Sequence, residues 1–214
     1  MKTKKRDLLN RYIPLWSIVP LVTIMAVNCL IYWGSSALTA GRYHFDFTMA
    51  FDREVPLLPV FVWFYILAFP FWAVGYLLAA RRGKDMFYRF VATDLTIHFI
   101  CFICFILIPT TNIRPEIPGN TLSEKILALV YSLDGGNSPS NLFPSIHCYV
   151  SWMCWKGVEG SEKVPKWYQR FFSGICNSDH YLYPGAEAAL HCGCSSGVAF
   201  GRVFLEILSE RAAT

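Results

Sequence analysis

Long apolar runs alternate with short polar connections along most of the chain. The first four runs cover residues 13–33, 56–80, 90–108 and 143–160, and a further run follows Val198. The first three are close to the roughly 20 apolar residues that a helix needs to cross a bilayer, and Lys156 can extend the fourth by reaching the surface. We therefore expect an all-α fold in which residues 1–214 form one domain, a polytopic membrane helix bundle of six intended transmembrane spans.

Positive charge is concentrated on alternate connections, which is the pattern of a membrane protein with a defined orientation. The 54% apolar content is too high for an ordinary soluble domain. The charge pattern predicts a basic cytoplasmic N-terminus over residues 1–12 and a multi-pass protein of the cell membrane. It also accounts for the net charge of +4 without a nucleic-acid partner. The basic residues of the first three such connections are Lys2, Lys4, Lys5, Arg6 and Arg11, then Arg81, Arg82, Lys84 and Arg89, then Lys156, Lys163, Lys166 and Arg170.

A polar loop becomes a helix at the sequence NLFPSIH, residues 141–147. Turn-forming residues from Asp134 to Ser140 precede it. Pro144 suits the first turn of a helix, and Ser145 adds a hydroxyl and a backbone N–H at a helix start, where anions are favoured. His147 can exchange a proton near neutral pH. These seven residues alone are explained equally well by an ordinary helix start that carries a histidine.

The connection before this stretch carries Arg114 in the sequence RP, and a guanidinium can grip phosphate oxygens with two donors. Residues 121–133 are predicted to form an amphipathic helix at the membrane interface, with Leu122, Ile126, Leu129 and Val130 on one face. The alternation of spans places Arg114 and His147 on the same, outer side of the membrane.

The sequences RP at 114–115 and FPSIH at 143–147 resemble the first two motifs of the type 2 phosphatidic acid phosphatase superfamily. The closest branch includes inositol phosphorylceramide synthases and bacterial relatives, and the resemblance covers about residues 50–160. It implies that Arg114 and Ser145 bind the phosphate of a lipid substrate and that His147 is the general acid. It also implies a phosphohistidine mechanism at an extracytoplasmic site, without metal or other cofactor. The family's lysine in the first motif is replaced here by Leu107.

The family's third motif, a nucleophilic histidine four residues before an aspartate, is missing from this chain. Residues 176–197 read CNSDHYLYPGAEAALHCGCSSG, where a fifth span and a catalytic loop are expected. We expect this span and loop to be irregular or disordered. His191 is the better substitute nucleophile, since it would reach the outer face. Together with Cys192 and Cys194, His191 resembles a set of three metal ligands. No fourth ligand is in sight, so no metal is expected.

For the anomalous segment, residues 171–197, we hypothesise a pair of compensating frameshifts. Back-translated with suitable codons and shifted by one nucleotide, residues 176–197 become AILITISTLVRKQHYIADVAAG. This reading restores an apolar run followed by HYIAD, the family's third motif. Ala189 then stands where the nucleophilic histidine belongs, and Gly193 stands where its aspartate belongs.

The function that we expect is therefore an impaired membrane lipid-phosphate phosphatase or phosphotransferase. The alternative is a catalytically inactive membrane protein that binds lipid or a partner through the same pocket. A small transporter would need paired polar groups within the spans, and Asp94 with His98, one helical turn apart, gives it limited support. We favour a structural role for that pair. Membrane lipids are the expected surroundings, and the pattern indicates no oligomeric state.

The frameshift hypothesis is tested at the level of DNA. Resequencing the codons for residues 171–197, beside the same region of close relatives, is expected to reveal one insertion and one deletion that compensate. An unambiguous in-frame read without either would refute it.

Overall fold

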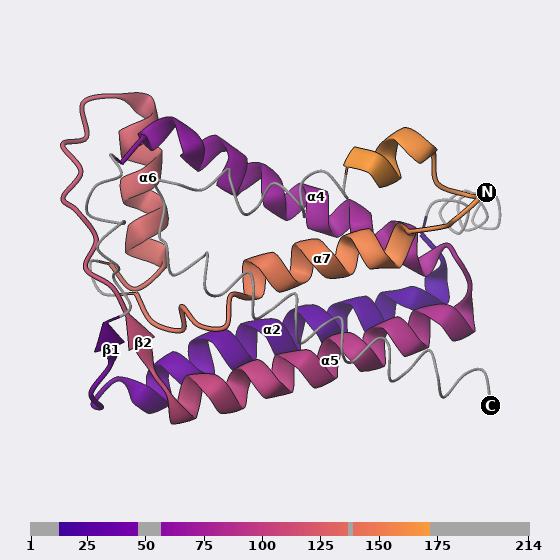
Figure 1. The fold of residues 1–214 in the computed structure, drawn as a ribbon, viewed down its shortest axis with the longest axis horizontal. Helices are drawn as coiled ribbons and strands as arrows, with labels where there is room; N and C mark the ends of the chain where they lie inside the picture. The colour runs from indigo at the N-terminus through magenta and orange to yellow at the C-terminus, as the bar shows by residue number, and fades with distance from the viewer. Residues whose placement is uncertain (1–12, 47–56, 137–138, 172–214) are drawn as a thin grey trace, which may run out of the picture.

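The computed structural model describes residues 13–46, 57–136 and 139–171 (Figure 1). The N-terminal segment, the fifth and sixth expected spans, residues 172–197 and His191 lie outside the described residues. Residues 166–171 are helical. The other helices are α2 (Ile18–Thr39) after the short 3₁₀ turn η1 (Leu15–Ser17), α4 (Val62–Ala80) after η2 (Pro59–Phe61), α5 (Lys84–Leu107), α6 (Leu122–Leu133) and α7 (Ile146–Val158).

Three of the described helices are long and apolar enough to cross a membrane, which indicates a membrane protein. They comprise Leu15–Thr39, Pro59–Ala80 and Lys84–Leu107, and they coincide with the first three apolar runs. Their surfaces carry exposed apolar side chains such as Val19 and Leu30, 73% and 71% exposed, as lipid-facing helices do. α7 has 13 residues, a rise of about 20 Å against a hydrocarbon core of about 30 Å. The expected number of six spans stays a prediction.

The short helix α7 lies at the centre of the described bundle. Figure 1 shows it between α4 on one side and the neighbouring pair α2 and α5 on the other. Tyr149, Trp152 and Met153 on α7 are at most 1% exposed. Because neighbours surround it on several sides, most of α7 is buried within protein.

The far end of α7 is packed tightly against the turn between α4 and α5. A Cβ added to Gly157 would lie 2.9 Å from Ala79 Cβ and 3.0 Å from a ring carbon of Phe90. Arg82 Nη1 donates to the carbonyl oxygens of Gly157 at 3.2 Å and Lys156 at 3.5 Å. A cation is favourable at the C-terminus of a helix, where carbonyl groups lack helical partners. These contacts fix the end of α7 to the turn.

A buried polar network joins four helices in the middle of the bundle. Asp94 Oδ1 on α5 accepts hydrogen bonds of 2.6 Å from both Tyr76 on α4 and Tyr149 on α7. His98 Nδ1 lies 3.3 Å from Asp94 Oδ2, and its Nε2 lies 3.2 Å from Asn28 Oδ1 on α2. Asp94 and His98 are at most 1% exposed. These hydrogen bonds connect α2, α4, α5 and α7. Such contacts are consistent with the structural role that we favour for Asp94 and His98.

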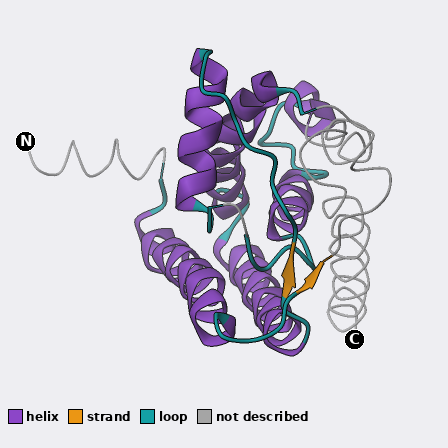
Figure 2. Ribbon diagram, turned by 90° about the vertical axis from the view of Figure 1, so that its left-hand side faces the viewer, coloured by secondary structure: helices purple, strands orange, loops and turns teal. Residues whose placement is uncertain are grey.

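One end of the bundle is closed by α6 and two short strands. Figure 2 views this end, where β1 (Phe45–Asp46) and β2 (Thr110–Thr111) lie side by side and pair in parallel. α6 runs across the direction of the long helices (Figure 1). Its start is stabilised by a capping box between Thr121 and Glu124.

The apolar surface of α6 is divided between two environments. Leu122 and Leu129 are exposed, whereas Leu127 and Val130 line a cavity beneath the helix. The predicted helix is confirmed as α6, and Leu122 and Val130 lie about 80° apart round it, so the predicted apolar face extends from the exposed surface to the cavity wall. The residues turned toward the bundle lie about a quarter turn or more farther round the helix.

Gly157→Ala is expected to destabilise the bundle by about 1–3 kcal/mol, because the added methyl group overlaps Ala79 and Phe90. The measurement is unfolding of the purified protein in detergent. The control is Gly34→Ala in α2, where nothing lies within 4 Å of an added Cβ. Equal stability of the two variants would contradict the proposed tight packing.

Candidate functional site

A cavity of about 350 Å³ lies between α4, α6 and the start of α7. Arg114, Ser145 and His147 all line it, so the structure brings together three of the site residues that the sequence predicts. His191, the fourth, lies outside the described residues. The remaining walls are largely apolar and include Leu57, Leu58, Phe61, Val62, Phe64, Leu67, Ala68, Phe71, Leu127 and Val130.

The loop that leads into α7 is held by α2 and β2. Thr110 Oγ1 on β2 accepts hydrogen bonds from the backbone N–H groups of Leu142 at 2.9 Å and Phe143 at 3.2 Å. Asn141 has a φ of 63°, a left-handed conformation that asparagine tolerates better than most residues. Its Nδ2 donates to the Tyr32 carbonyl on α2 at 2.8 Å. β2, which follows the end of α5, and the side of α2 thus fix where α7 begins.

Ser145 is the N-cap of α7, one position before the first helical residue, Ile146. Its Oγ accepts a long hydrogen bond of 3.5 Å from the backbone N–H of Cys148. Pro144 therefore precedes the cap. The sequence suggested that it would lie in the first helical turn, and this position is wrong by two residues. The cavity is bordered by Ser145, His147 and Cys148, so the first turn of α7 forms part of its wall.

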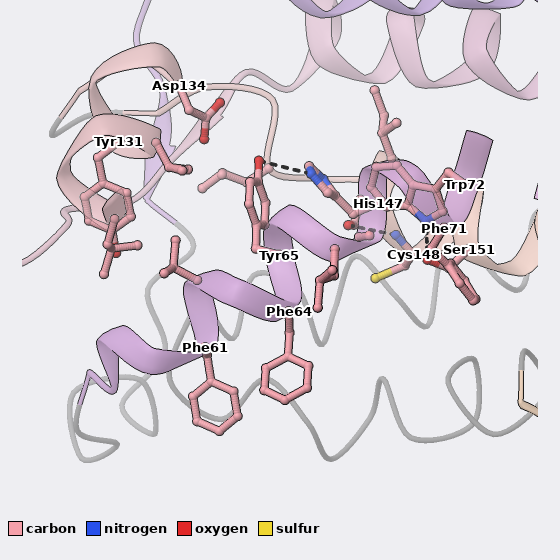
Figure 3. A pocket seen from close by; sticks show the side chains of 18 of the residues that line it. Phe61, Phe64, Tyr65, Phe71, Trp72, Tyr131, Asp134, His147, Cys148 and Ser151 are labelled. Atoms are coloured by element: carbon pink, nitrogen blue, oxygen red, sulfur yellow. Dashed lines mark hydrogen bonds between the residues drawn. The ribbon is translucent and has the colours of Figure 1, made fainter. Parts of the chain in front are cut away.

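His147 is enclosed by aromatic rings of α4 and bonded to one of them. Its Nε2 lies 3.2 Å from the Tyr65 hydroxyl (Figure 3). The ring centres of Tyr65 and Trp72 are each 5.2 Å from that of the imidazole, and Phe69 follows at 6.4 Å. This enclosure fixes the orientation of the imidazole. A proton on Nε2 points to the Tyr65 oxygen, whereas with Nε2 unprotonated the hydroxyl donates instead.

Arg114 is held against the C-terminal end of α6. Its Nη1 donates to the carbonyl oxygens of Asp134 at 3.0 Å and Gly136 at 3.2 Å, and its Nη2 lies 2.5 Å from Asp134 Oδ2. Its Cζ lies 4.3 Å from the centre of the Tyr131 ring. Gly135 and Gly136, with φ of 79° and 67°, turn the chain at the end of the helix. The guanidinium thus meets the negative end of the helix dipole, a carboxylate and an aromatic face together.

Asp134 and Tyr32 are site residues that sequence reasoning missed. Asp134 Oδ1 accepts a hydrogen bond from the Tyr32 hydroxyl, while Oδ2 faces Arg114. In the sequence, Asp134 belongs to the turn-forming residues from Asp134 to Ser140 and carries no further signal. Tyr32 lies near the end of an apolar run, where a tyrosine is typical of the membrane interface. The two residues are 102 positions apart in the sequence, and no local pattern links them, so the sequence did not predict their contact.

Two further features of the expected site concern a second cation and a metal. Leu107, at the position where the resembled family has a lysine, is 67% exposed at the end of α5 and does not line the cavity. Within residues 13–46, 57–136 and 139–171, no three His, Cys, Asp or Glu side chains are grouped as metal ligands. The described part of the cavity therefore offers one guanidinium, one carboxylate, one imidazole and several hydroxyl groups.

Comparison of the chain with family models, curated proteins and solved structures finds no match. The residues of the cavity and the resemblance of the two short motifs therefore carry the functional assignment proposed below.

Asp134→Ala is expected to lower the free energy of unfolding by about 3 kcal/mol, because it leaves the buried guanidinium of Arg114 without its carboxylate. The matched control is Glu159→Ala, which removes an ion pair with Lys156 at 2.6 Å. The Glu159 side chain is 46% exposed, so its loss is expected to cost less than about 1 kcal/mol. Chemical unfolding in detergent measures both variants, and equal losses would contradict a structural role of the Arg114 pair.

Proposed function

We propose that this chain binds a lipid phosphate in the cavity and carries the chemistry of a lipid-phosphate phosphatase or phosphotransferase in impaired form. The observation that carries the proposal is that Arg114, Ser145 and His147 border one cavity whose other walls are mainly apolar. A ligand that fits both regions has a phosphate at one end and hydrocarbon at the other. Pockets of about 300 Å³ and above accommodate small molecules, and this one can take a headgroup with the adjoining part of its chains.

The apolar walls support a ligand that reaches the cavity from the side. Leu58, Phe64 and Leu67 line the cavity and are also 48%, 57% and 61% exposed on the surface of η2 and α4. Exposed apolar residues on a helix long enough to span a membrane are expected to face lipid chains. A lipid can therefore place its phosphate near Arg114 while its chains extend past these residues.

The phosphate would be bound by Arg114 and by the start of α7. Arg114 is 7% exposed and its guanidinium is held against the end of α6 at the cavity wall, so a phosphate in the cavity would meet a cation of fixed position. The first turn of a helix adds backbone N–H groups and the positive end of the dipole. Charge that develops on phosphoryl oxygens during transfer is stabilised by preorganised donors of this kind.

His147 would act as the general acid. A nucleophilic nitrogen attacks phosphorus, the phosphorus–oxygen bond to the lipid breaks, and His147 gives its proton to the leaving oxygen. Water or an alcohol then attacks the phosphohistidine, transfers a proton to His147 and regenerates the nucleophile. His191 is the proposed substitute nucleophile, and the disrupted third motif is the reason for proposing impaired activity.

A catalytically inactive binding protein is the second candidate. It is favoured by the separation of the two parts of the site: the described residues enclose the cavity with Arg114, Ser145 and His147, while the nucleophile motif of the resembled family is missing from the sequence. Such a protein would bind the same lipids by the same contacts without turning them over.

We also propose a multi-pass arrangement with the N-terminus in the cytoplasm and the cavity on the extracytoplasmic side. The cavity lies beside α6 and the start of α7, whereas Arg82 meets the other end of α7. Arg81, Arg82 and Lys84 are grouped at the turn between α4 and α5. Basic residues on the side opposite the cavity agree with the positive-inside rule.

The test is formation of fluorescent diacylglycerol by the purified chain in nanodiscs. Lipids with a fluorescent chain and either a phosphomonoester or a phosphodiester headgroup are supplied, since diacylglycerol is released whether water or an alcohol accepts the phosphoryl group. We expect slow turnover that His147→Ala reduces by about 100-fold or more, the usual contribution of a general acid. His191→Ala is expected to abolish it.

His44→Ala is the matched control, because His44 follows α2 and does not line the cavity. It should leave diacylglycerol formation unchanged. Turnover that survives His147→Ala would refute the acid assignment. Absence of turnover in the unmodified chain, together with lipid binding that depends on Arg114, would favour the inactive binding protein.

A further inference from the structure

The charged side chains that line the described cavity cancel one another. Arg114 is the only Lys or Arg, and Asp134 the only Asp or Glu, among the described lining residues. They lie 2.5 Å apart, with side chains 5% and 22% exposed. The family's second cation is absent because its position is Leu107. With His147 in its unprotonated form, the described polar lining of the cavity consequently carries no net charge before any ligand binds.

This neutrality restricts which phosphate can bind. A phosphomonoester carries about −1.5 to −2 charges near neutral pH. Placed beside an arginine that is already paired with Asp134, it would bring uncompensated negative charge into a largely apolar cavity, which is unfavourable. A ligand that carries its own cation avoids this cost.

We propose that the lipid bound in this cavity is zwitterionic, a phosphodiester of an amino alcohol such as ethanolamine or choline. Its phosphate lies at Arg114 and its ammonium group lies toward Asp134. Four charges then alternate in sign, and each has an opposite neighbour. The inference rests on the function proposed above and specifies its ligand.

The surroundings of Asp134 suit an ammonium group. The Tyr32 hydroxyl donates to Asp134 Oδ1, and Tyr32, Tyr65 and Tyr131 line the same cavity. Figure 3 shows the Tyr65 ring in view between Asp134 and His147. Aromatic faces attract ammonium and quaternary ammonium groups, and a carboxylate beside them adds direct charge compensation. The polar end therefore has separate places for an anion and for a cation.

The proposal is tested by lipid binding to the purified full chain in a non-ionic detergent, with intrinsic tryptophan fluorescence or calorimetry as the measurement. The probes share dioctanoyl chains and differ in headgroup: phosphatidylcholine and phosphatidylethanolamine are zwitterionic, whereas phosphatidic acid and phosphatidylglycerol are anionic. We expect the zwitterionic pair to bind about tenfold more tightly or better, equivalent to about 1.4 kcal/mol. Soluble phosphocholine, which lacks chains, is expected to bind more weakly than either.

Asp134→Asn keeps the side-chain shape and removes the charge. The variant is expected to bind zwitterionic lipids about tenfold more weakly and to bind phosphatidic acid more tightly, so that the headgroup preference is reversed. Glu116→Gln is the control, because Glu116 is exposed in the loop after Arg114 and does not line the cavity. It should leave the preference unchanged.

The outcomes separate this inference from the proposed function. Equal or tighter binding of phosphatidic acid by the unmodified chain overturns the zwitterionic ligand, and so does an unchanged preference in Asp134→Asn. If that variant does not fold, the preference of the unmodified chain decides. The proposed function stands in these cases as long as Arg114→Gln abolishes lipid binding. Binding of none of the lipids, or binding unaffected by Arg114→Gln, overturns both.

Discussion

The ion pair between Arg114 and Asp134 is the contact on which the architecture of the cavity depends. It joins the loop after β2 to the end of α6, and the carbonyl groups at that end strengthen it. α6 provides one wall, so the cavity exists only while this helix is held against the bundle. The same contact fixes the guanidinium at the wall of the cavity. One buried pair therefore supports both the shape of the site and its charge.

The position of His147 follows from how α7 is held at its two ends and its middle. Thr110 fixes the loop at its start, Asp94 accepts from Tyr149 one turn later, and Gly157 packs against Ala79 at its end. Since α7 is largely buried, displacement along its axis would break contacts with several helices. A histidine on such an element has little freedom, as the general acid proposed for His147 requires.

The three long helices were predictable because length and apolar composition alone identify a helix that can cross a membrane. The presence of Arg114 and His147 in one cavity was predictable from the alternation of spans and from the two short motifs. The partners of these residues were not. The run that forms α4 is apolar on all sides and does not fix the rotation of the helix about its axis. The sequence therefore could not predict that Tyr65 faces His147. The contact between Arg114 and Asp134 depends on the direction in which α6 leaves its loop, and the hydrophobic pattern does not specify that direction.

The half-exposed walls formed by Leu58, Phe64 and Leu67 have a consequence for how occupancy is controlled. A ligand that passes these side chains dissolves first in the apolar phase around the helices. Saturation then follows the mole fraction of the lipid in that phase, and diluting the sample with water leaves it unchanged. Adding inert amphiphile lowers occupancy without any change in the intrinsic affinity of the site.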